Sequence, residues 1–457
     1  MEAAQSQNIS ESALKQLFSK QGNLNILQNY RGERRVNKPV LSETIKFLLV
    51  IGFWIGAAFG SGVAAVFGAI TATSFIVETY NLPSWIAEFA VVTSPLAAVM
   101  LFVPVNAKLL VLLERKLLSL LTTRLGPNRV GPNGLLQTLA DALKLLFKED
   151  IVPDKADKVL FFLAPALFFT PSVIAFLPIM SVAGDGIGPF AKIEFPTSLL
   201  FIIAVSSLAV MGLIMAGWAS NNKYSLMGGL RSAAQAISYE IPFVLSLVAF
   251  VILSGSLNLK EIADSQAGGL LDWNIFAAGS LLNIENYSNL WSIPLLGLLI
   301  VLVLAIAFLI YFCSLAEVNR IPFDLPEAES ELVSGYNTEF TGMKFALFFL
   351  AEYTNLFIVS TVLAILFFGG PYIGIPFIDE AIRKPLLETP LGNLSWLPGT
   401  FILLNKCYLF IALAIWIRAT LPRFRSDQLM GLAWKVLIPI SLVVVLLAAV
   451  CKTFLVI

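Results

Sequence analysis

The sequence predicts an all-α, polytopic helical membrane protein, with about nine transmembrane helices and one short interfacial amphipathic helix. Of its 457 residues, 58% are hydrophobic and only 13% are charged, whereas soluble domains carry about 25% charged residues. The apolar residues gather in runs of about 20 or more, the length that a helix needs to cross a bilayer. No alternating strand pattern suggests a barrel, so helices are the spanning structure that fits.

The apolar runs divide the chain into three parts. Residues 1–44 form a polar N-terminal extension, residues 45–91 an extra N-terminal transmembrane helix with its connector, and residues 92–457 an eight-helix membrane domain. Glycine and alanine are frequent in the first span, which suits close helix packing. The predicted spans are residues 45–77, 92–113, 159–182, 195–219, 233–254, 293–315, 345–368, 401–421 and 433–456.

The basic residues predict the orientation of these spans. With the N-terminus placed on one side, 22 of the 30 Lys and Arg residues fall in segments on that side and only five on the other. Basic segments stay on the inner side of a membrane. The N-terminus and nearly all the charged motifs are therefore expected on the cytoplasmic, matrix or stromal face.

Several kinds of chemistry are excluded within this chain. It has no histidine, which rules out histidine-ligated haem, zinc triads and Ser-His-Asp catalysis. The three cysteines, Cys313, Cys407 and Cys451, are far apart in apolar runs and are expected to be core residues, because iron–sulfur clusters need four closely spaced cysteines. Phosphate-binding glycine loops are also absent. Any redox chemistry must come from partners or from a diffusing substrate.

Acidic residues gather in the segment 315–353. It has a formal charge of −5, because its seven acids are offset only by Arg320 and Lys344. It lies between two predicted spans, where ionising every acid is costly, so some acids are expected to bind a proton. The segment therefore predicts a proton-handling site or an ion path. Its acids are Glu317, Asp324, Glu327, Glu329, Glu331, Glu339 and Glu352.

Part of this cluster also has a purely structural explanation. Pro326 can begin a helix, and a helix dipole favours one or two acids in the first turn. Glu327 and Glu331, however, lie four residues apart on one face, where like charges repel and favour sharing a proton. Glu352 is expected about one turn inside the following span.

A lone carboxylate, Glu240, is expected about two turns inside the span 233–254, just before Pro242. The segment before it, with Lys223 and Arg231, is expected to be a glycine-containing loop. An ionisable residue inside a membrane is a functional candidate by default. The alternative is a carboxyl group that is hydrogen-bonded to a neighbouring helix.

A short helix is expected to begin near Asn133, after two Gly-Pro pairs that break the preceding helix. It combines a leucine stripe with charged residues and, at about 15 residues, is too short to span a bilayer. It is therefore either a surface anchor or a lid over an amphipathic ligand that enters from the bilayer.

Basic residues also mark the last two spans. Arg418 falls at a span end, with Arg423 and Arg425 beyond it, where both can reach lipid phosphates. Lys406 lies deeper in the span and needs a carboxylate partner or a pocket.

Six stretches together resemble the membrane subunit at the junction of respiratory complex I, the family of the bacterial NADH-quinone oxidoreductase H subunit and mitochondrial NADH dehydrogenase subunit 1. They stand in family order, and the resemblance covers roughly 70% of the chain. The stretches are ERK (114–116), GPNRVGPNGLLQTLADALKLLFKED (126–150), SNNKYSLMGGLRSAAQAISYEIP (220–242), NRIPFDLPEAESELVSGYNTEF (319–340), FALFFLAEY (345–353) and WIRATLPRFRSDQLM (416–430).

The resemblance implies a non-redox-centre subunit of a proton-translocating enzyme, which forms a quinone access chamber and couples quinone reduction to proton movement. It implies quinone-chamber positions at Arg115, Asp141, Arg231, Phe349 and Arg418. It implies a proton path through Glu240, Glu317, Asp324, Glu327, Glu329, Glu331 and Glu352, with Arg320 and Lys406 in support.

The same resemblance implies no metal or covalently bound cofactor in this chain. The substrate is expected to be a quinone of the ubiquinone, menaquinone or plastoquinone type, with iron–sulfur clusters and FMN only in partner subunits. The expected partners are hydrophilic quinone-site subunits, neighbouring membrane-arm subunits and lipids, but no nucleic acid. The expected location is the bacterial plasma membrane or the mitochondrial inner membrane.

Two other functions compete with this interpretation. A membrane anchor of an energy-converting hydrogenase has no quinone, and the complete stretch 126–150 argues against it. A stand-alone transporter often has inverted repeats around a broken helix, and no clear repeat is present in this sequence.

Overall fold

A computed structural model describes residues 84–124, 126–131, 134–182, 195–276, 292–325, 332–375 and 396–456, with the single positions 56, 60, 377 and 379. The predicted extension 1–44, and the predicted span 45–77 apart from Gly56 and Gly60, lie outside the described residues. Every regular element in the described part is a helix. The predicted all-α class is therefore confirmed.

Seven helical segments of the described residues are long and apolar enough to cross a membrane. They correspond to seven of the nine predicted spans, and the predicted span 92–113 lies inside a further long helix, α4 (Ser84–Leu121). The seven are α6–α7 (Lys158–Ile174 and Phe176–Val182), α8 (Ser198–Ala219), α9 (Lys223–Ser254), α11 (Ser292–Glu317), α13 (Gly342–Phe367), α15 (Trp396–Thr420) and α16–α17 (Ser426–Leu432 and Ile438–Val456).

Short elements connect these segments. The amphipathic helix α5 (Gln137–Phe147) begins four residues later than predicted. The others are α10 (Leu259–Asp264), the 3-10 turns η3 (Asn274–Phe276) and η5 (Gly335–Asn337), and the π-helical turn η7 (Ala433–Leu437) between α16 and α17.

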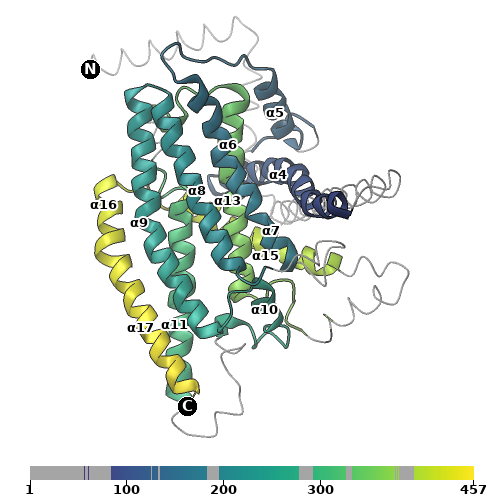
Figure 1. Cartoon of the computed structure of the whole chain (residues 1–457), viewed down its shortest axis with the longest axis vertical. Coiled ribbons are helices and arrows are strands. Elements are labelled where there is room, and N and C mark those ends of the chain that lie inside the picture. Colours follow the sequence, from purple (N-terminus) through teal and green to yellow (C-terminus); the bar gives the residue numbers. More distant parts are fainter. Residues whose placement is uncertain are drawn as a thin grey trace, which may run out of the picture. The chain divides into compact units, whose positions relative to one another are not determined.

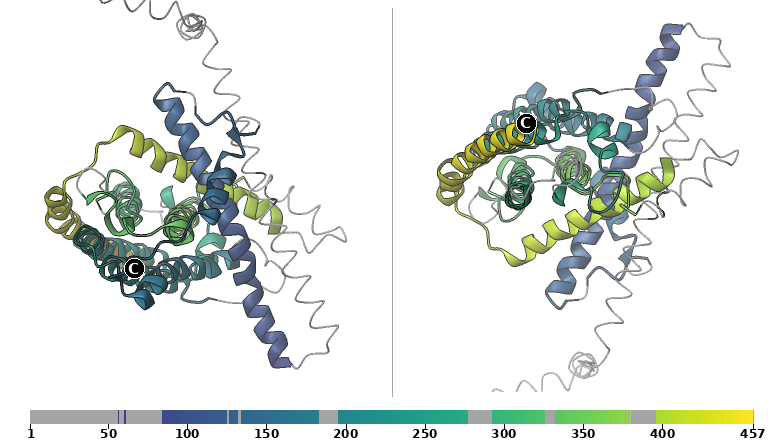
Figure 2. Two further views of the ribbon diagram at one scale, coloured as in Figure 1. Left: turned by 90° about the horizontal axis from the view of Figure 1, so that it is seen from above. Right: turned by 90° about the horizontal axis from the view of Figure 1, so that it is seen from below.

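The helices of the unit Trp54–Ile457 pack in layers. Helix α9 contacts α8 and α17, and α8 contacts α6, which makes a row (Figure 1). Helices α11 and α13 pack against this row, and α15 packs on α13 from the other side. Figure 2 shows α11 and α13 nearly end on but α4 and α15 lengthwise, so α4 and α15 cross the other helices obliquely. Both meet α13, which thus lies between the row and the oblique pair.

Helix α9 corrects one prediction. The expected loop with Lys223 and Arg231 is helical, because Asn222 caps the helix by accepting a hydrogen bond from the Tyr224 N–H at 3.0 Å. Glu240 therefore lies near the middle of a 32-residue helix and not two turns from its start. The glycines of this segment serve close packing. A Cβ on Gly228 would lie 2.7 Å from the Gly335 Cα.

Gln235 fixes the segment after α11 against α9. Its side chain is buried, and its Nε2 lies 2.8 Å from the Ala316 carbonyl oxygen and 2.7 Å from that of Phe323. The non-helical backbone of residues 321–325, which the prolines predict, is thus partly satisfied by a side chain. This contact holds the acidic segment next to the helix that carries Glu240.

The close approach of α9 and η5 predicts the effect of one methyl group. Gly228→Ala should destabilise the protein by about 1–3 kcal/mol, because its Cβ meets backbone atoms that cannot rotate away. The apparent Tm of the purified protein in detergent measures this effect. Gly297→Ala is the control, because its Cβ meets nothing within 4 Å in the described structure. Equal Tm values for the two variants would contradict the packing argument.

Candidate functional site

A buried carboxylate, Glu114, joins four parts of the chain near the end of α4. It is 6% exposed. Its Oε2 accepts hydrogen bonds from the Tyr353 hydroxyl at 2.7 Å and from Arg320 Nη1 at 3.3 Å, and its Oε1 accepts one from Arg418 Nη1. The Arg320 guanidinium also stacks over the Tyr353 ring, 4.0 Å from its centroid. We call Glu114, Arg320, Tyr353 and Arg418 the Glu114 cluster.

The Glu114 cluster brings together the predicted residues Arg320 and Arg418, and two residues that are not among the predicted sites. One carboxylate here faces two guanidiniums, so the cluster has a net positive charge. Glu114 and Tyr353 each stand in a stretch that carries the family resemblance, ERK and FALFFLAEY. A carboxylate at the end of an apolar run next to two bases was the signal that could have identified Glu114.

The neighbour of Glu114 belongs to a different site. Arg115 Nη1 lies 2.6 Å from Asp141 Oδ2, with side chains 46% and 39% exposed. Successive residues of a helix point about 100° apart, so Glu114 faces the interior while Arg115 reaches α5. The two predicted chamber residues Arg115 and Asp141 are thus in contact with each other and form a pair separate from the Glu114 cluster. The next residue, Lys116, is partly buried, which lowers its pKa from the usual value.

Helix α5 presents an exposed apolar face. Phe147 is 86% exposed and Leu146 54%. The segment after it is held by Lys344, whose Nζ lies 2.9 Å from Asp150 Oδ2 and 3.6 Å from the Phe162 ring centroid. The helix is therefore anchored at its end while its apolar side chains remain open.

The other two predicted chamber residues lie on different helices. Phe349, on α13, is half-buried, with its ring 4.8 Å from that of Phe345. Arg231 is half-buried on α9. Neither is one of the four residues that make up the Glu114 cluster.

The predicted acidic path is spread over several elements. Glu240 lies on α9, Glu317 ends α11, and Glu352 lies nearly three turns inside α13. Asp324 Oδ2 accepts a hydrogen bond from Arg423 Nη2 at 3.0 Å, which gives Arg423 a protein partner and not only lipid phosphates. Three further predicted residues, Glu327, Glu329 and Glu331, lie outside the described residues.

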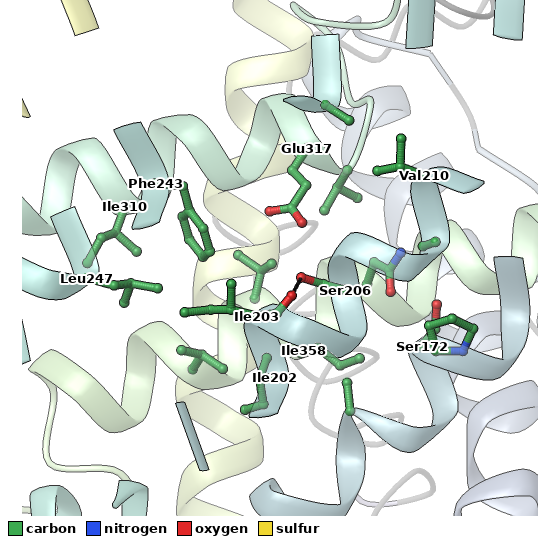
Figure 3. Close-up of a pocket in the computed structure, with 18 of the residues that line it drawn as sticks. Ser172, Ile202, Ile203, Ser206, Val210, Phe243, Leu247, Ile310, Glu317 and Ile358 are labelled. Carbon is green, nitrogen blue, oxygen red and sulfur yellow. Dashed lines mark hydrogen bonds between the residues drawn. The ribbon is translucent and has the colours of Figure 1, made fainter. Parts of the chain in front are cut away.

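Two of these acids have a defined local environment. Glu352 is buried and accepts a hydrogen bond from the Tyr336 hydroxyl at 2.7 Å. Glu317 lines a cavity of about 70 Å³ between α6, α8, α9, α11 and α13, and Figure 3 shows its carboxylate directed into that cavity above Ser206. Glu240 and Glu317 lie on α9 and α11, which pack against each other.

Lys406 lies away from the acids that it was expected to support. Its Nζ donates hydrogen bonds to the carbonyl oxygens of Phe368, Gly370 and Tyr372 at 2.5, 3.1 and 2.5 Å. These carbonyls follow the C-terminal end of α13, roughly 22 Å along the helix from Glu352. A lysine at a helix C-terminus is a stabilising cap. Among the described residues, no group of three acids or cysteines is placed to hold a metal ion.

The buried Glu114 cluster and the solvated Arg115–Asp141 pair are expected to contribute very differently to the stability of the protein. Glu114→Ala should destabilise the protein by about 3 kcal/mol, because it leaves two guanidiniums without their buried partner. Asp141→Ala should cost less than about 1 kcal/mol, because its pair with Arg115 is solvated. Thermal unfolding of both variants measures the difference, and a larger loss for Asp141→Ala would contradict the assignment.

Comparison with known proteins places this site in a family. Residues 94–449 match the model of the NADH dehydrogenase family. The chain is 44% identical to the NADH-quinone oxidoreductase H subunit of Geobacillus thermodenitrificans over 347 residues, which is 75% of this chain and 89% of the relative.

Other relatives carry the same name. The H subunit of Brevibacillus brevis is 45% identical over 346 residues, or 75% of this chain and 87% of the relative. The H subunit of Ruthia magnifica is 38% identical over 389 residues, or 82% and 96% of the two chains. The chain therefore belongs to the NADH dehydrogenase family as an H subunit of the NADH-quinone oxidoreductase complex, complex I.

Proposed function

We propose that this subunit forms the quinone access chamber of the complex and couples quinone reduction to proton movement through its acids. The observation that carries the proposal is the carboxylate of Glu317, which is directed into a cavity between helices that can span a membrane. The residues that line the cavity beside Glu317 include no Arg or Lys. A carboxylate in a cavity whose described lining has no base favours holding a proton over being ionised.

The surroundings of α5 support the quinone part of the proposal. An exposed apolar helix next to a solvated ion pair can admit a molecule with a polar head and an apolar tail. The Glu114 cluster lies beside Arg115, because Glu114 directly precedes Arg115 on α4, and its two guanidiniums supply charged hydrogen-bond donors. The half-buried rings of Phe345 and Phe349 supply apolar wall. The chamber is proposed to run from α5 past these residues.

The remaining assignments follow from this role. The redox centres, iron–sulfur clusters and FMN, are assigned to partner subunits, and the quinone is a substrate. Hydrophilic quinone-site subunits and neighbouring membrane-arm subunits are the proposed partners. The eight-helix domain is proposed to span residues 92–457, after the extension 1–44 and the extra span 45–91. The N-terminus is proposed to lie on the cytoplasmic or matrix face of a bacterial plasma membrane or a mitochondrial inner membrane.

The coupling is tested by removing one proton carrier at a time. Glu240→Gln and Glu317→Gln should each lower quinone reduction and proton translocation by at least tenfold in vesicles that contain the complete complex, because an amide cannot carry a proton. Glu261→Gln is the control, because Glu261 lies on α10 and its hydrogen bonds within the described residues are local, to Ser256 and Asn258. Near-normal turnover and pumping in both variants would contradict the proposed coupling.

The chamber is tested separately through affinity. Arg115→Ala should raise the quinone KM or weaken a quinone-site inhibitor about threefold to tenfold, while Arg124→Ala, at an exposed arginine just after α4, should change neither. Inhibitor titration on the purified complex measures both variants. Unchanged KM and inhibition for Arg115→Ala would remove this residue from the chamber. A complex that binds no such inhibitor would contradict the quinone function itself.

A further inference from the structure

We propose that the loop after α13 forms a site for a monovalent cation, and that the ammonium group of Lys406 fills this site from within the chain. When the lysine side chain is removed, the site should accept a free alkylammonium ion of the same size. The inference goes beyond the proposed function and does not rest on it, because none of the residues that form this site lines the cavity beside Glu317 or belongs to the Glu114 cluster.

Three backbone carbonyl groups form one side of the site. The oxygens of Phe368, Gly370 and Tyr372 lie 2.5, 3.1 and 2.5 Å from Lys406 Nζ, so each N–H donor of the ammonium group has an acceptor. The loop can turn these carbonyls towards one point because Gly369 and Gly370 adopt left-handed backbone conformations, with φ of 70° and 48°. In K⁺ channels, rings of backbone carbonyls replace the hydration shell of the ion. The loop is therefore suited to hold a cation that has lost its water.

An aromatic ring forms another side of the site. The centroid of the Trp273 ring lies 4.5 Å from Lys406 Nζ, within the range of a cation–π interaction. The ring can approach the loop because two loop residues have no side chain. A Cβ on Gly369 would lie 2.4 Å from Trp273 Nε1, and a Cβ on Gly374 would lie 2.8 Å from the same atom. Aromatic faces bind alkylammonium ligands in this way.

These ligands suit a single positive charge. Ca²⁺ and Mg²⁺ need more oxygen ligands, which usually include carboxylates or water. Within the described part of the chain, Lys406 Nζ contacts neutral carbonyls and a ring, and no carboxylate forms an ion pair with it. The buried acid of this loop, Asp379, instead accepts hydrogen bonds from the N–H groups of Ile373 and Gly374, both at 3.1 Å. The site therefore favours an ammonium-type ion over a divalent metal.

The loop is also held by contacts that do not involve Lys406. Gln266 is fully buried, and its Nε2 donates a hydrogen bond to the Ile365 carbonyl oxygen at 2.9 Å. Its Oε1 accepts hydrogen bonds from the N–H groups of Gly369 at 3.0 Å and Asn274 at 3.1 Å. These bonds connect the end of α13 to the segment after α10. The carbonyl groups should therefore keep their positions when the lysine side chain is shortened.

Chemical rescue of the complete complex tests this site. Lys406→Ala keeps Cβ and removes the remaining carbons and the nitrogen, so propylammonium has the size of the missing group. The variant should lower the apparent Tm of the purified complex by about 2–4 °C, because three carbonyls lose their partner. Propylammonium chloride should restore most of this loss in a saturable manner. The neutral isostere 1-propanol should not restore it.

Two further variants separate the charge of Lys406 from its packing. Lys406→Met fills similar space without a charge, so it should lose stability as Lys406→Ala does. Lys452→Ala is the matched control, because Lys452 Nζ also caps a helix but donates to one carbonyl, that of Leu253, at 2.9 Å. Propylammonium should not stabilise this control.

Three outcomes would overturn the inference. They are a wild-type Tm for Lys406→Met, equal stabilisation of Lys406→Ala by propylammonium and 1-propanol, and equal stabilisation of Lys406→Ala and Lys452→Ala by propylammonium. If Lys406→Ala assembles only when propylammonium is present, the inference is supported, and Lys406→Met decides it if that variant does not assemble at all. The measurement needs no turnover, so it is independent of the proposed coupling.

Discussion

The interior of this protein depends on one constraint: polar groups inside a membrane must find partners within the protein, because lipid offers none. Gln235 donates hydrogen bonds to the non-helical backbone after α11, and Lys406 donates them to carbonyls at the end of α13. Glu114 accepts hydrogen bonds from two guanidiniums and a phenol. Each of these side chains connects segments that are far apart in the chain. The hydrogen bonds that satisfy the polar groups therefore also fix how the helices are arranged.

The acids of the predicted path differ in whether they have a basic partner. Asp324 has a basic partner, whereas Glu317 faces an apolar-walled cavity whose lining contains no base. A fully satisfied set of ion pairs is inert, because every charge is held in place. Asp324 is thus held by Arg423, while the proposed coupling assigns proton exchange to Glu317.

Much of the fold could be predicted from the sequence, because membrane helices are long apolar runs. The seven segments that the structure confirms begin and end within a few residues of their predicted positions, except that α9 begins ten residues early and α16 begins seven residues before the predicted span 433–456. Helix α9 differed because Gly228 and Gly229 are typical of loops in isolation, while here they allow backbones to touch. Glu114 was not predicted because its role depends on Arg320 and Arg418, which are distant in sequence. Partners at such separations leave no local pattern, so only the position of Glu114 at the end of an apolar run, next to two bases, marks it in the sequence.

The Glu114 cluster also has a consequence for biosynthesis. Arg320 follows Glu114 by 206 residues and Arg418 by 304. Because a chain is synthesised from its N-terminus, Glu114 reaches the membrane before either arginine has left the ribosome. The complete cluster can therefore form only after α15, which carries Arg418, has been synthesised.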